Sequence, residues 1–504
     1  MTTKRSDFPL IKQTLSTLLG TILGTVTLVG MHHYYRRQQH PDARLQDYLS
    51  GVRALSSAKL PLSRVHYAYQ QATKSWQHAY YHYDEQAKSA EACTQWHTTT
   101  MLARPVCWVS GVASMPPHIS LKNAGNTPDI NTVTNADDSG FGVVGIDADR
   151  QLVWQTTMPE RVHDIVVQPL IKGNKTDSSN DNNGASHRHV VVMGRRPSAS
   201  FWVLDTATGQ VQFALKAAAK RHFYGHACYS LDGSLLYITE NDTVTLNGKI
   251  GIYDAHKSYQ KIAEFDSQGI GPHELMMHPD GDTLVIANGG IKTEQASREE
   301  LNLDSMRPSL VYLNRHHGAL LEQIVPEHNQ MSIRHLAMHE NGTVMIGIQF
   351  QGERHLNVPL VLTHQRGDAA FTALKMPHNQ WQRFHHYIAS VAVDSQSNLL
   401  CVTTPIGGCA VVYDLDTYEL IDSMRLPDCA GTSVLSKAGE SGFIVSDGQG
   451  QLTRLMLDKQ AQDRRILKDS QWHNMSFDNH LQALGQVSQH TLIDDSGFKN
   501  QTAS

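Results

Sequence analysis

Most short motifs that identify a known chemistry are absent from this sequence. There is no C-x-x-C pair, which argues against a zinc ribbon or a thioredoxin-type centre, and no Walker A loop, G-x-S-x-G, H-E-x-x-H or C-x-x-C-H. The segments GVVGID and GIGPHE are glycine-containing turns and do not form a dinucleotide-binding fingerprint. A basic stripe is also missing, and the net charge is only −5 over 504 residues, so nucleic acid is not an expected partner.

Cysteine is scarce, whereas histidine is abundant. The six cysteines permit disulfides without establishing them, and the nearest pairs are Cys93 with Cys107 and Cys401 with Cys409. The chain has 29 histidines, many of which we expect on the surface or in loops. Histidine is the commonest metal ligand and titrates near neutral pH, so its positions are the first to examine.

The N-terminus carries an apolar segment after a basic start. Lys4, Arg5 and Lys12 precede residues 13–35, which hold no formally charged residue and have the apolar centre LSTLLGTILGTVTLVGM. About 17–20 apolar residues are just enough to span a bilayer. Because no small-x-small cleavage site follows, we expect an uncleaved inner-membrane anchor over residues 1–37 and a periplasmic location, with a cleaved signal peptide or a buried helix as the alternatives.

The remainder of the chain changes character near residue 105. Residues 38–104 are rich in Ala, Gln, Tyr and Lys with few β-branched residues, which predicts a helical flank or stalk. From 105 to 490, short runs of Val, Ile, Leu and Tyr alternate with Asp-Gly, Asn-Gly and Thr-Gly turns, which is typical of strands and hairpins. Residues 491–504 are expected to be a disordered tail.

A weak internal repeat organises this β-rich part. HACYSLDGSLLYITEND (226–242) aligns with HELMMHPDGDTLVIANGG (273–290) and HLAMHENGTVMIGIQFQG (335–352), and a third and a fourth strand follow each pair. The four-strand units recur every 42 to 63 residues. Four antiparallel strands repeated radially predict an all-β fold, a β-propeller, with two separate β-sandwiches as the alternative.

Seven blades follow from counting the first strands. Segments 107–114 and 141–154 look like second and third strands that lack a first strand, and residues 476–484 can supply it. The ring would then close by pairing strands from the two ends of the chain, which removes open sheet edges. The predicted first strands open at His163, His226, His273, His335, Ser390, Thr432 and His480.

First strands line the central channel of a propeller, so five blades would present a histidine at one mouth of that channel. Imidazoles with a few amides and carboxylates suit Fe, Cu or Zn. We therefore predict His163, His226, His273, His335 and His480 as metal ligands. The alternative is a shared packing role in which each imidazole bonds a neighbouring blade.

Other polar residues are predicted to complete that face. Ser390 and Thr432 fill the two blades without histidine, and the loops between second and third strands supply the further candidates Arg195, Arg196, Glu240, Asn241, Asp242, Asn288 and Gln349. The arginine pair would hold a carboxylate or phosphate, or would form a salt-bridged contact between blades. Asp164 and Glu274 directly follow channel histidines. Alternation along a strand would turn them into the sheet, where they would support a ligand or bond the next blade.

Several stretches resemble one family. GRRP, GHACYSLDGSLLYITEND, GKIGIYD, GIGPHELMMHPDGDTLVIANGGI, LNLDSMRPSL, SIRHLAM and DNHL are similar to segments of the domain of unknown function 1513 family, DUF1513, which groups exported bacterial propellers. The resemblance implies a seven-bladed propeller outside the cytoplasm. It also implies a part in iron acquisition, because members are often encoded beside imelysin-like and dihaem oxidase-like proteins. The chain departs from the family at Thr404 and Ile406, where a serine and an arginine are usual.

Three hypotheses for the function remain open. The first is a periplasmic propeller that binds a metal ion or a metal-bearing ligand at its histidine-rich channel mouth and assists iron acquisition. The second is an enzyme, either a lactonase-like hydrolase or a metal-dependent oxidoreductase, although no catalytic residue is identified. The third is a scaffold that holds the imelysin-like and dihaem oxidase-like partners. Fold alone does not decide among them, because propellers support many functions.

Overall fold

In the computed structural model, the described residues are 96–115, 140–169, 188–196, 198–293, 300–435, 440–458 and 464–485. All of them lie in the unit Gln95–Ser504. The predicted export segment 1–37, most of the predicted flank 38–104 and the tail 491–504 lie outside these ranges.

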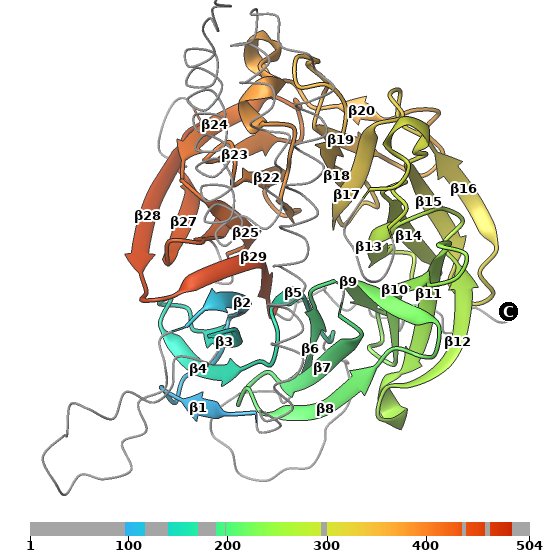
Figure 1. The fold of residues 1–504 in the computed structure, drawn as a ribbon. Helices are drawn as coiled ribbons and strands as arrows, with labels where there is room; N and C mark the ends of the chain where they lie inside the picture. Colours follow the sequence, from blue (N-terminus) through green and yellow to red (C-terminus); the bar gives the residue numbers. More distant parts are fainter. Residues whose placement is uncertain are drawn as a thin grey trace, which may run out of the picture. The chain divides into compact units, whose positions relative to one another are not determined.

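Seven antiparallel sheets form a closed ring, as the sequence predicts (Figure 1). Six of the sheets have four strands that follow one another along the chain. These are β5 (Val162–Val167), β6 (His189–Gly194), β7 (Ser200–Asp205), β8 (Val211–Lys216); β9 (Arg221–Tyr229), β10 (Leu235–Asp242), β11 (Gly248–Asp254), β12 (Gln260–Asp266); β13 (Pro272–Met277), β14 (Thr283–Asn288), β15 (Ser309–Asn314), β16 (Leu320–Ile324). The other three are β17 (Met331–Met338), β18 (Val344–Phe350), β19 (Val361–His364), β20 (Thr372–Ala373); β21 (Ser390–Asp394), β22 (Leu399–Thr404), β23 (Cys409–Asp414), β24 (Leu420–Arg425); β25 (Cys429–Val434), β26 (Gly442–Asp447), β27 (Gln451–Leu457), β28 (Ile466–Trp472).

The seventh sheet joins strands from early and late in the chain. Its order is β1-β4-β3-β2-β29, with bounds β1 (Thr98–Thr100), β2 (Trp108–Ser114), β3 (Gly142–Ile146), β4 (Leu152–Thr157) and β29 (Ser476–Ala483). β29 pairs antiparallel with β2, so the predicted closure is confirmed. The sheet also has a fifth strand, β1, in place of the predicted four. Its three threonines are β-branched, which favours a strand where the prediction had a helical flank.

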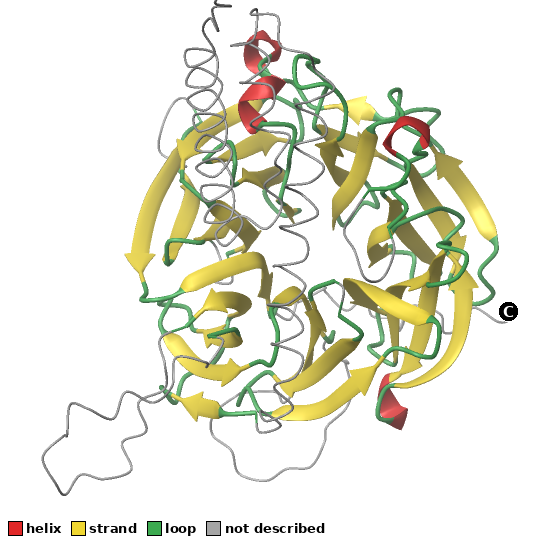
Figure 2. Cartoon of the chain, viewed as in Figure 1, coloured by secondary structure: helices red, strands yellow, loops and turns green. Residues whose placement is uncertain are grey.

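Helix is confined to short turns in the part of the chain that the structure describes (Figure 2). These are the 3-10 helices η1 (Ala255–Lys257), η2 (Leu303–Ser305), η3 (Pro377–Asn379) and η4 (Trp381–Phe384). None of the helices in the described ranges has the length and hydropathy to cross a bilayer.

The hydrophobic core lies between successive blades. Middle strands such as β14, β22, β23 and β26 are buried at every residue, whereas the outer strand β8 alternates between half-buried and exposed positions. A middle strand is covered on both faces by neighbouring blades, so its sequence reads as a continuous apolar run and not as an alternation. Residues of the β2 and β5 blades, for example Val109 and Ile165, belong to one such buried cluster.

The innermost strands contact one another around the channel. Their order is β29, β5, β9, β13, β17, β21, β25 and back to β29. Side-chain acceptors join neighbours in this ring through backbone N–H groups of the next blade. Oδ2 of Asp164 accepts from Ala227, Oε2 of Glu274 from Leu336, Oγ of Ser390 from Thr432 and Oγ of Ser433 from Ala483, at 3.2, 3.1, 3.3 and 3.0 Å.

Closure of the ring depends on apolar contacts of β29. Phe477 is 2 % exposed and packs in one cluster with Trp108 and Leu481. We expect Phe477→Ala to lower the free energy of unfolding by about 3–4 kcal/mol, because it removes a buried ring and leaves a cavity. Urea unfolding measures this loss. Gln482→Ala, an exposed position on the same strand, is the control and should change stability by less than about 0.5 kcal/mol. Equal effects of the two substitutions would contradict a closure held by this cluster.

Candidate metal centre

Five histidines reach the channel from irregular places in five innermost strands. Each lies at or beside a shift in strand register, and such bulges redirect side chains away from regular alternation. The shifts fall between Val162 and Ile165 in β5, Phe223 and Ala227 in β9, Pro272 and Glu274 in β13, Ile333 and His335 in β17, and Phe477 and Leu481 in β29. His163 and His273 are near the start of their strands, as predicted, whereas His226, His335 and His480 are in the middle because those strands extend further toward the mouth.

The five imidazoles converge on one place, which we call the histidine cluster (His163, His226, His273, His335 and His480). The ring centroid of His226 is 4.6 Å from those of His163 and His273 and 5.0 Å from that of His480. His273 and His335 are 5.0 Å apart. The sequence prediction that distant histidines meet around one axis is therefore correct as geometry.

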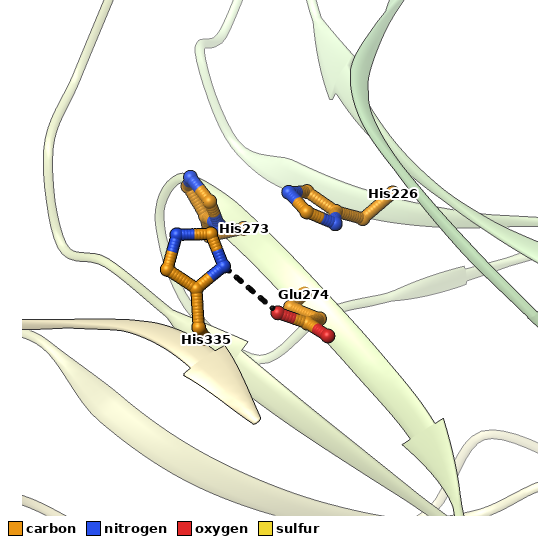
Figure 3. Close-up of side chains that lie close together, drawn as sticks. All are labelled: His226, His273, Glu274 and His335. Atoms are coloured by element: carbon orange, nitrogen blue, oxygen red, sulfur yellow. Dashed lines mark hydrogen bonds and ion pairs between the residues drawn. The ribbon is translucent and has the colours of Figure 1, made fainter. Parts of the chain in front are cut away.

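Two overlapping groups of side chains have metal-ligand spacing, with all ligand atoms of a group within 4.8 Å of one another. The glutamate set comprises His226, His273, Glu274 and His335 (Figure 3). The histidine set comprises His163, His226 and His480. A tetrahedral site with bonds of about 2.0–2.1 Å has ligand atoms about 3.4 Å apart, so displacements of about an ångström would close either set around an ion.

Glu274, which the sequence predicted in a supporting role, also belongs to one of the sets with ligand spacing. Its Oε2 accepts from the backbone of the next blade at Leu336, as expected, but it also lies 3.2 Å from Nδ1 of His335. The bulge after Pro272 breaks the alternation on which the expectation depended. Pro272, directly before the predicted strand, was the available signal, because proline in a sheet is confined to edges, strand starts and bulges.

Asp164 of β5 contacts two members of the cluster, one from each of the two neighbouring blades. Its Oδ2 is 3.3 Å from Nδ1 of His226, and its Oδ1 is 3.6 Å from Nδ1 of His480. It also accepts the Ala227 backbone N–H. A carboxylate behind an imidazole fixes the ring's orientation, which is the role predicted for this residue.

Several imidazole nitrogens of the cluster are buried with no hydrogen-bond partner in the protein. They are Nδ1 of His163, Nε2 of His226, Nδ1 of His273 and Nε2 of His480. Buried polar atoms are normally paired, so a group of imidazole nitrogens that face one another fits a bound metal better than a packing role.

Burial also sets the protonation of the cluster. Burial and the neighbouring His226 hold the pKa values of His163 and His273 well below the usual range, and burial lowers the pKa of His480 to about 4. These three rings are neutral at pH 7, which is the form that binds metal. For His226, burial favours the neutral ring, but the Asp164 carboxylate outweighs it and the pKa is raised.

The two carboxyl groups beside the cluster differ in their environments. Burial raises the pKa of Glu274 to about 7. For Asp164, burial alone would raise the pKa, but the charge of His226 and its hydrogen bond lower it to about 2. Asp164 is therefore an anion that pairs with an imidazole, whereas Glu274 is a carboxyl group whose ionised form needs a nearby positive charge.

The predicted arginine pair does not act as one clamp. Nη1 of Arg195 is 3.7 Å from Oδ1 of Asp478, which also binds Arg161 with Nη2 at 2.8 Å, so the salt-bridge alternative describes Arg195. Arg196 donates to Oγ1 of Thr293 at 2.6 Å and lies over the ring of Tyr224 at 5.2 Å. The two guanidinium groups therefore have different partners.

Glu240, Asn241 and Asp242 have structural contacts at the end of β10. Glu240 is buried and accepts from Tyr253 Oη and Lys261 Nζ, both at 2.6 Å. Asp242 pairs with Arg221 at 2.9 Å and caps a turn, and Asn241 is buried. The segment resembles a calcium-lactonase site in composition, but these contacts give no support to such a site.

The remaining candidates lie on or beside the inner strands. The side-chain amide of Asn288 donates to the Ser267 carbonyl at 3.0 Å, and Gln349 forms an isolated bridge with Tyr387. Ser390 and Thr432 are on β21 and β25, as predicted, and are joined by the hydrogen bond across blades described above. Two further histidines have contacts of their own: His222 is wholly buried, and Nε2 of His386 contacts the Leu356 carbonyl at 3.0 Å.

Comparison with known proteins agrees with the repeat pattern. The model of a family described as "Protein of unknown function (DUF1513)" matches residues 182–484. The chain belongs to this family. The resemblance inferred from the sequence is therefore confirmed, and the matched range includes four members of the histidine cluster together with Glu274.

Other comparisons add little. A search of the curated proteins gives no match. Among solved structures, the chain is similar to Kuenenia stuttgartiensis hydrazine synthase, at 14 % identity over 62 % of this chain and 87 % of that chain, with a TM-score of 0.45. It is also similar to a mitotic checkpoint complex chain, at 13 % identity over 57 % and 76 %, with a TM-score of 0.41. Similarities at these values carry no argument about the function of the DUF1513 protein.

Asp447, at the end of the second strand of its blade, is a buried acidic group whose titration should affect the stability of the fold. Asp447 ends β26, is 2 % exposed, and its Oδ1 accepts from the N–H groups of Gln449 and Gln451 at 2.9 and 2.8 Å. Burial raises the pKa of Asp447 to about 6. The folded state therefore binds a proton more tightly than the unfolded state, and stability falls as pH rises from about 4 to 6.

We expect Asp447→Asn to remove this dependence, because an amide keeps the acceptor oxygen and carries no charge. The variant should be more stable than the parent by about 1–2 kcal/mol at pH 7.5 and should lose most of that advantage at pH 4.5. Urea unfolding at both pH values measures the difference. Asp304→Asn, an exposed carboxylate, is the control. A pH-independent effect of Asp447→Asn would contradict the raised pKa.

Proposed function

We propose that this protein is a periplasmic metal-binding propeller that holds a first-row transition-metal ion, Fe, Cu or Zn, in its histidine cluster and assists iron acquisition. One observation carries the proposal: five imidazoles from five blades, spread over residues 163–480, converge and form, with the Glu274 carboxylate, two overlapping sets at ligand spacing. A packing role does not account for buried ring nitrogens that lack partners.

The donor atoms restrict the class of metal. Imidazole nitrogen suits Zn, Cu, Fe and Ni, and a single carboxylate adds the charge that favours a divalent ion. Calcium and magnesium bind through six or more oxygen atoms, which neither set provides. No cysteine belongs to either set among the described residues, so sites built on thiolate are not favoured.

The location and the partners are separate parts of the proposal. Export is supported by the apolar segment 13–35 after Lys4, Arg5 and Lys12. The imelysin-like and dihaem oxidase-like partners follow from the family, and we propose them as the proteins that this propeller serves.

A metal-dependent oxidoreductase is the second candidate. The glutamate set has four ligands, so an ion that prefers six would keep positions for a substrate. The lactonase-like alternative has no comparable support, because Glu240 and Asp242 are held in structural contacts. For the scaffold alternative, the insertion at 292–308 would be the surface that holds a partner. Residues 294–299 of this insertion lie outside the described ranges, so no observation favours this alternative.

Metal content tests the main proposal. We expect the purified protein to bind Fe, Cu or Zn stoichiometrically at pH 7.5, and His226→Ala with His273→Ala to weaken binding by about 100-fold or more, because each set loses a ligand. Elemental analysis and calorimetric titration measure both. The control replaces two exposed histidines, His316→Ala with His317→Ala, and should leave binding unchanged. A parent protein that binds none of these metals at neutral pH would falsify the proposal.

Cell fractionation tests the location. The full chain should be recovered with the periplasmic side of the inner membrane, and a chain lacking residues 1–37 should stay in the cytoplasm, because the apolar segment directs export. Protease added to spheroplasts should digest the first protein and spare the second. Equal distribution of the two chains would show that residues 1–37 do not direct export.

A further inference from the structure

The glutamate set and the histidine set have only His226 in common. Its ring lies between the sets, with its centroid 4.6 Å from that of His163 on one side and 4.6 Å from that of His273 on the other. Between the sets, the rings of His163 and His273 are 6.0 Å apart and those of His335 and His480 are 5.6 Å apart, similar to the 5.8 Å between His226 and His335 within the glutamate set. His226 is therefore the imidazole common to two overlapping places that can hold an ion.

Asp164 lies beside His226 and the histidine set. Nδ1 of His226 lies 3.3 Å from Oδ2 of Asp164, whose Oδ1 is 3.6 Å from His480 of the histidine set. In Figure 3 a ring nitrogen of His226 points toward His273 of the glutamate set. Nε2 of His226 is buried without a hydrogen-bond partner.

A neutral imidazole binds one metal ion, because one nitrogen carries a proton and only the other has a lone pair to donate. His226 can therefore complete one set at a time. Completing both sets together would require removal of the one remaining N–H proton of the neutral ring, to give an imidazolate anion.

The local charge opposes a second ion. Asp164 and Glu274 are the carboxylates beside the cluster, and Asp478 is already paired with Arg195. Two carboxylates compensate one divalent ion. Two divalent ions would repel each other four times as strongly as two unit charges at the same separation, in a buried site.

We infer that the cluster holds one divalent transition-metal ion at a time, and that the ion moves between the glutamate set and the histidine set with His226 as the common ligand. The inference rests on the proposed metal-binding function and goes beyond it, because it assigns a step of transfer within the site. The glutamate set has four ligands and one negative charge, so it holds the ion more tightly. The histidine set is the weaker position, through which the ion enters and leaves.

The step is a ligand exchange without oxidation or reduction. Bonds from the ion to His273, Glu274 and His335 break as bonds to His163 and His480 form. His226 stays bound throughout as the common ligand, so the exchange needs no gain or loss of a proton. Asp164, within reach of His226 and His480, orients both rings for the second position.

Titration of the full-length protein with Co²⁺, followed by visible absorption, tests the inference. The parent should bind one equivalent. His163→Ala with His480→Ala should still bind one equivalent with the parent's spectrum, because the glutamate set is intact. His273→Ala with His335→Ala should also bind one equivalent, about 100-fold more weakly and with a different spectrum from the histidine set. His226→Gln should weaken binding more than the loss of His163 and His480.

Each outcome decides something different. Two equivalents in the parent would overturn the inference in favour of a paired centre. Complete loss of binding in either double variant that retains the parent's circular dichroism would also overturn it, because the residues would then form one composite site. A parent that binds no metal would instead remove the proposed function itself.

A kinetic measurement tests whether His163 and His480 form the route by which the ion leaves or only support the glutamate set. Excess EDTA should remove Co²⁺ several-fold more slowly from His163→Ala with His480→Ala than from the parent, because the weaker position is the route of release. His316→Ala with His317→Ala should release the ion at the parent's rate. Faster or unchanged release from the cluster variant would overturn the assignment of the histidine set as the exit.

Discussion

Closure of the ring by the pairing of β29 with β2 is the constraint on which the rest of the structure depends. Each innermost strand contacts the innermost strands of the two neighbouring blades, and the contact of β25 and β5 with β29 completes the circle around the channel. β29 also carries His480, and its Asp478 is bound by Arg161 and Arg195 of the next blade. The strand that closes the fold therefore also completes the candidate centre.

Two carboxylates hydrogen-bond neighbouring blades and also contact the histidine cluster. Asp164 and Glu274 each bind the backbone of the following blade and each contact an imidazole of the cluster. A buried carboxylate is destabilising unless it is paired. For Asp164 and Glu274, the backbone N–H group and the imidazole both provide this pairing. The relative positions of the blades and the orientation of the imidazoles are thus set by the same side chains.

Much of this arrangement could be predicted from the sequence because the repeat is periodic. A histidine, a turn pair and an apolar run recur in register, and a propeller places equivalent positions of each unit around one axis. That reasoning located all five histidines and the closing strand. Equivalent position also placed Ser390 and Thr432 on the two remaining inner strands, although it does not reveal which side chains approach within ligand distance.

The structure departs from the expectation where regular geometry fails. Glu274 bonds the next blade as predicted, and a bulge at Pro272 also brings it to ligand spacing with three histidines. Loops between second and third strands were read as one polar face, but Glu240 and Asp242 satisfy lysine, tyrosine and arginine neighbours within their own blade. The strand Thr98–Thr100 was missed because three residues are too few for a periodicity to be recognised.

The number of blades has a consequence for the centre itself. Every imidazole of the cluster comes from a different sheet, so the distances among them are fixed by the diameter of the channel and not by any local segment. A ring of eight sheets would be wider and would separate the rings, and a ring of six would crowd them. Gain or loss of one repeat unit would therefore abolish the centre even if every histidine were retained.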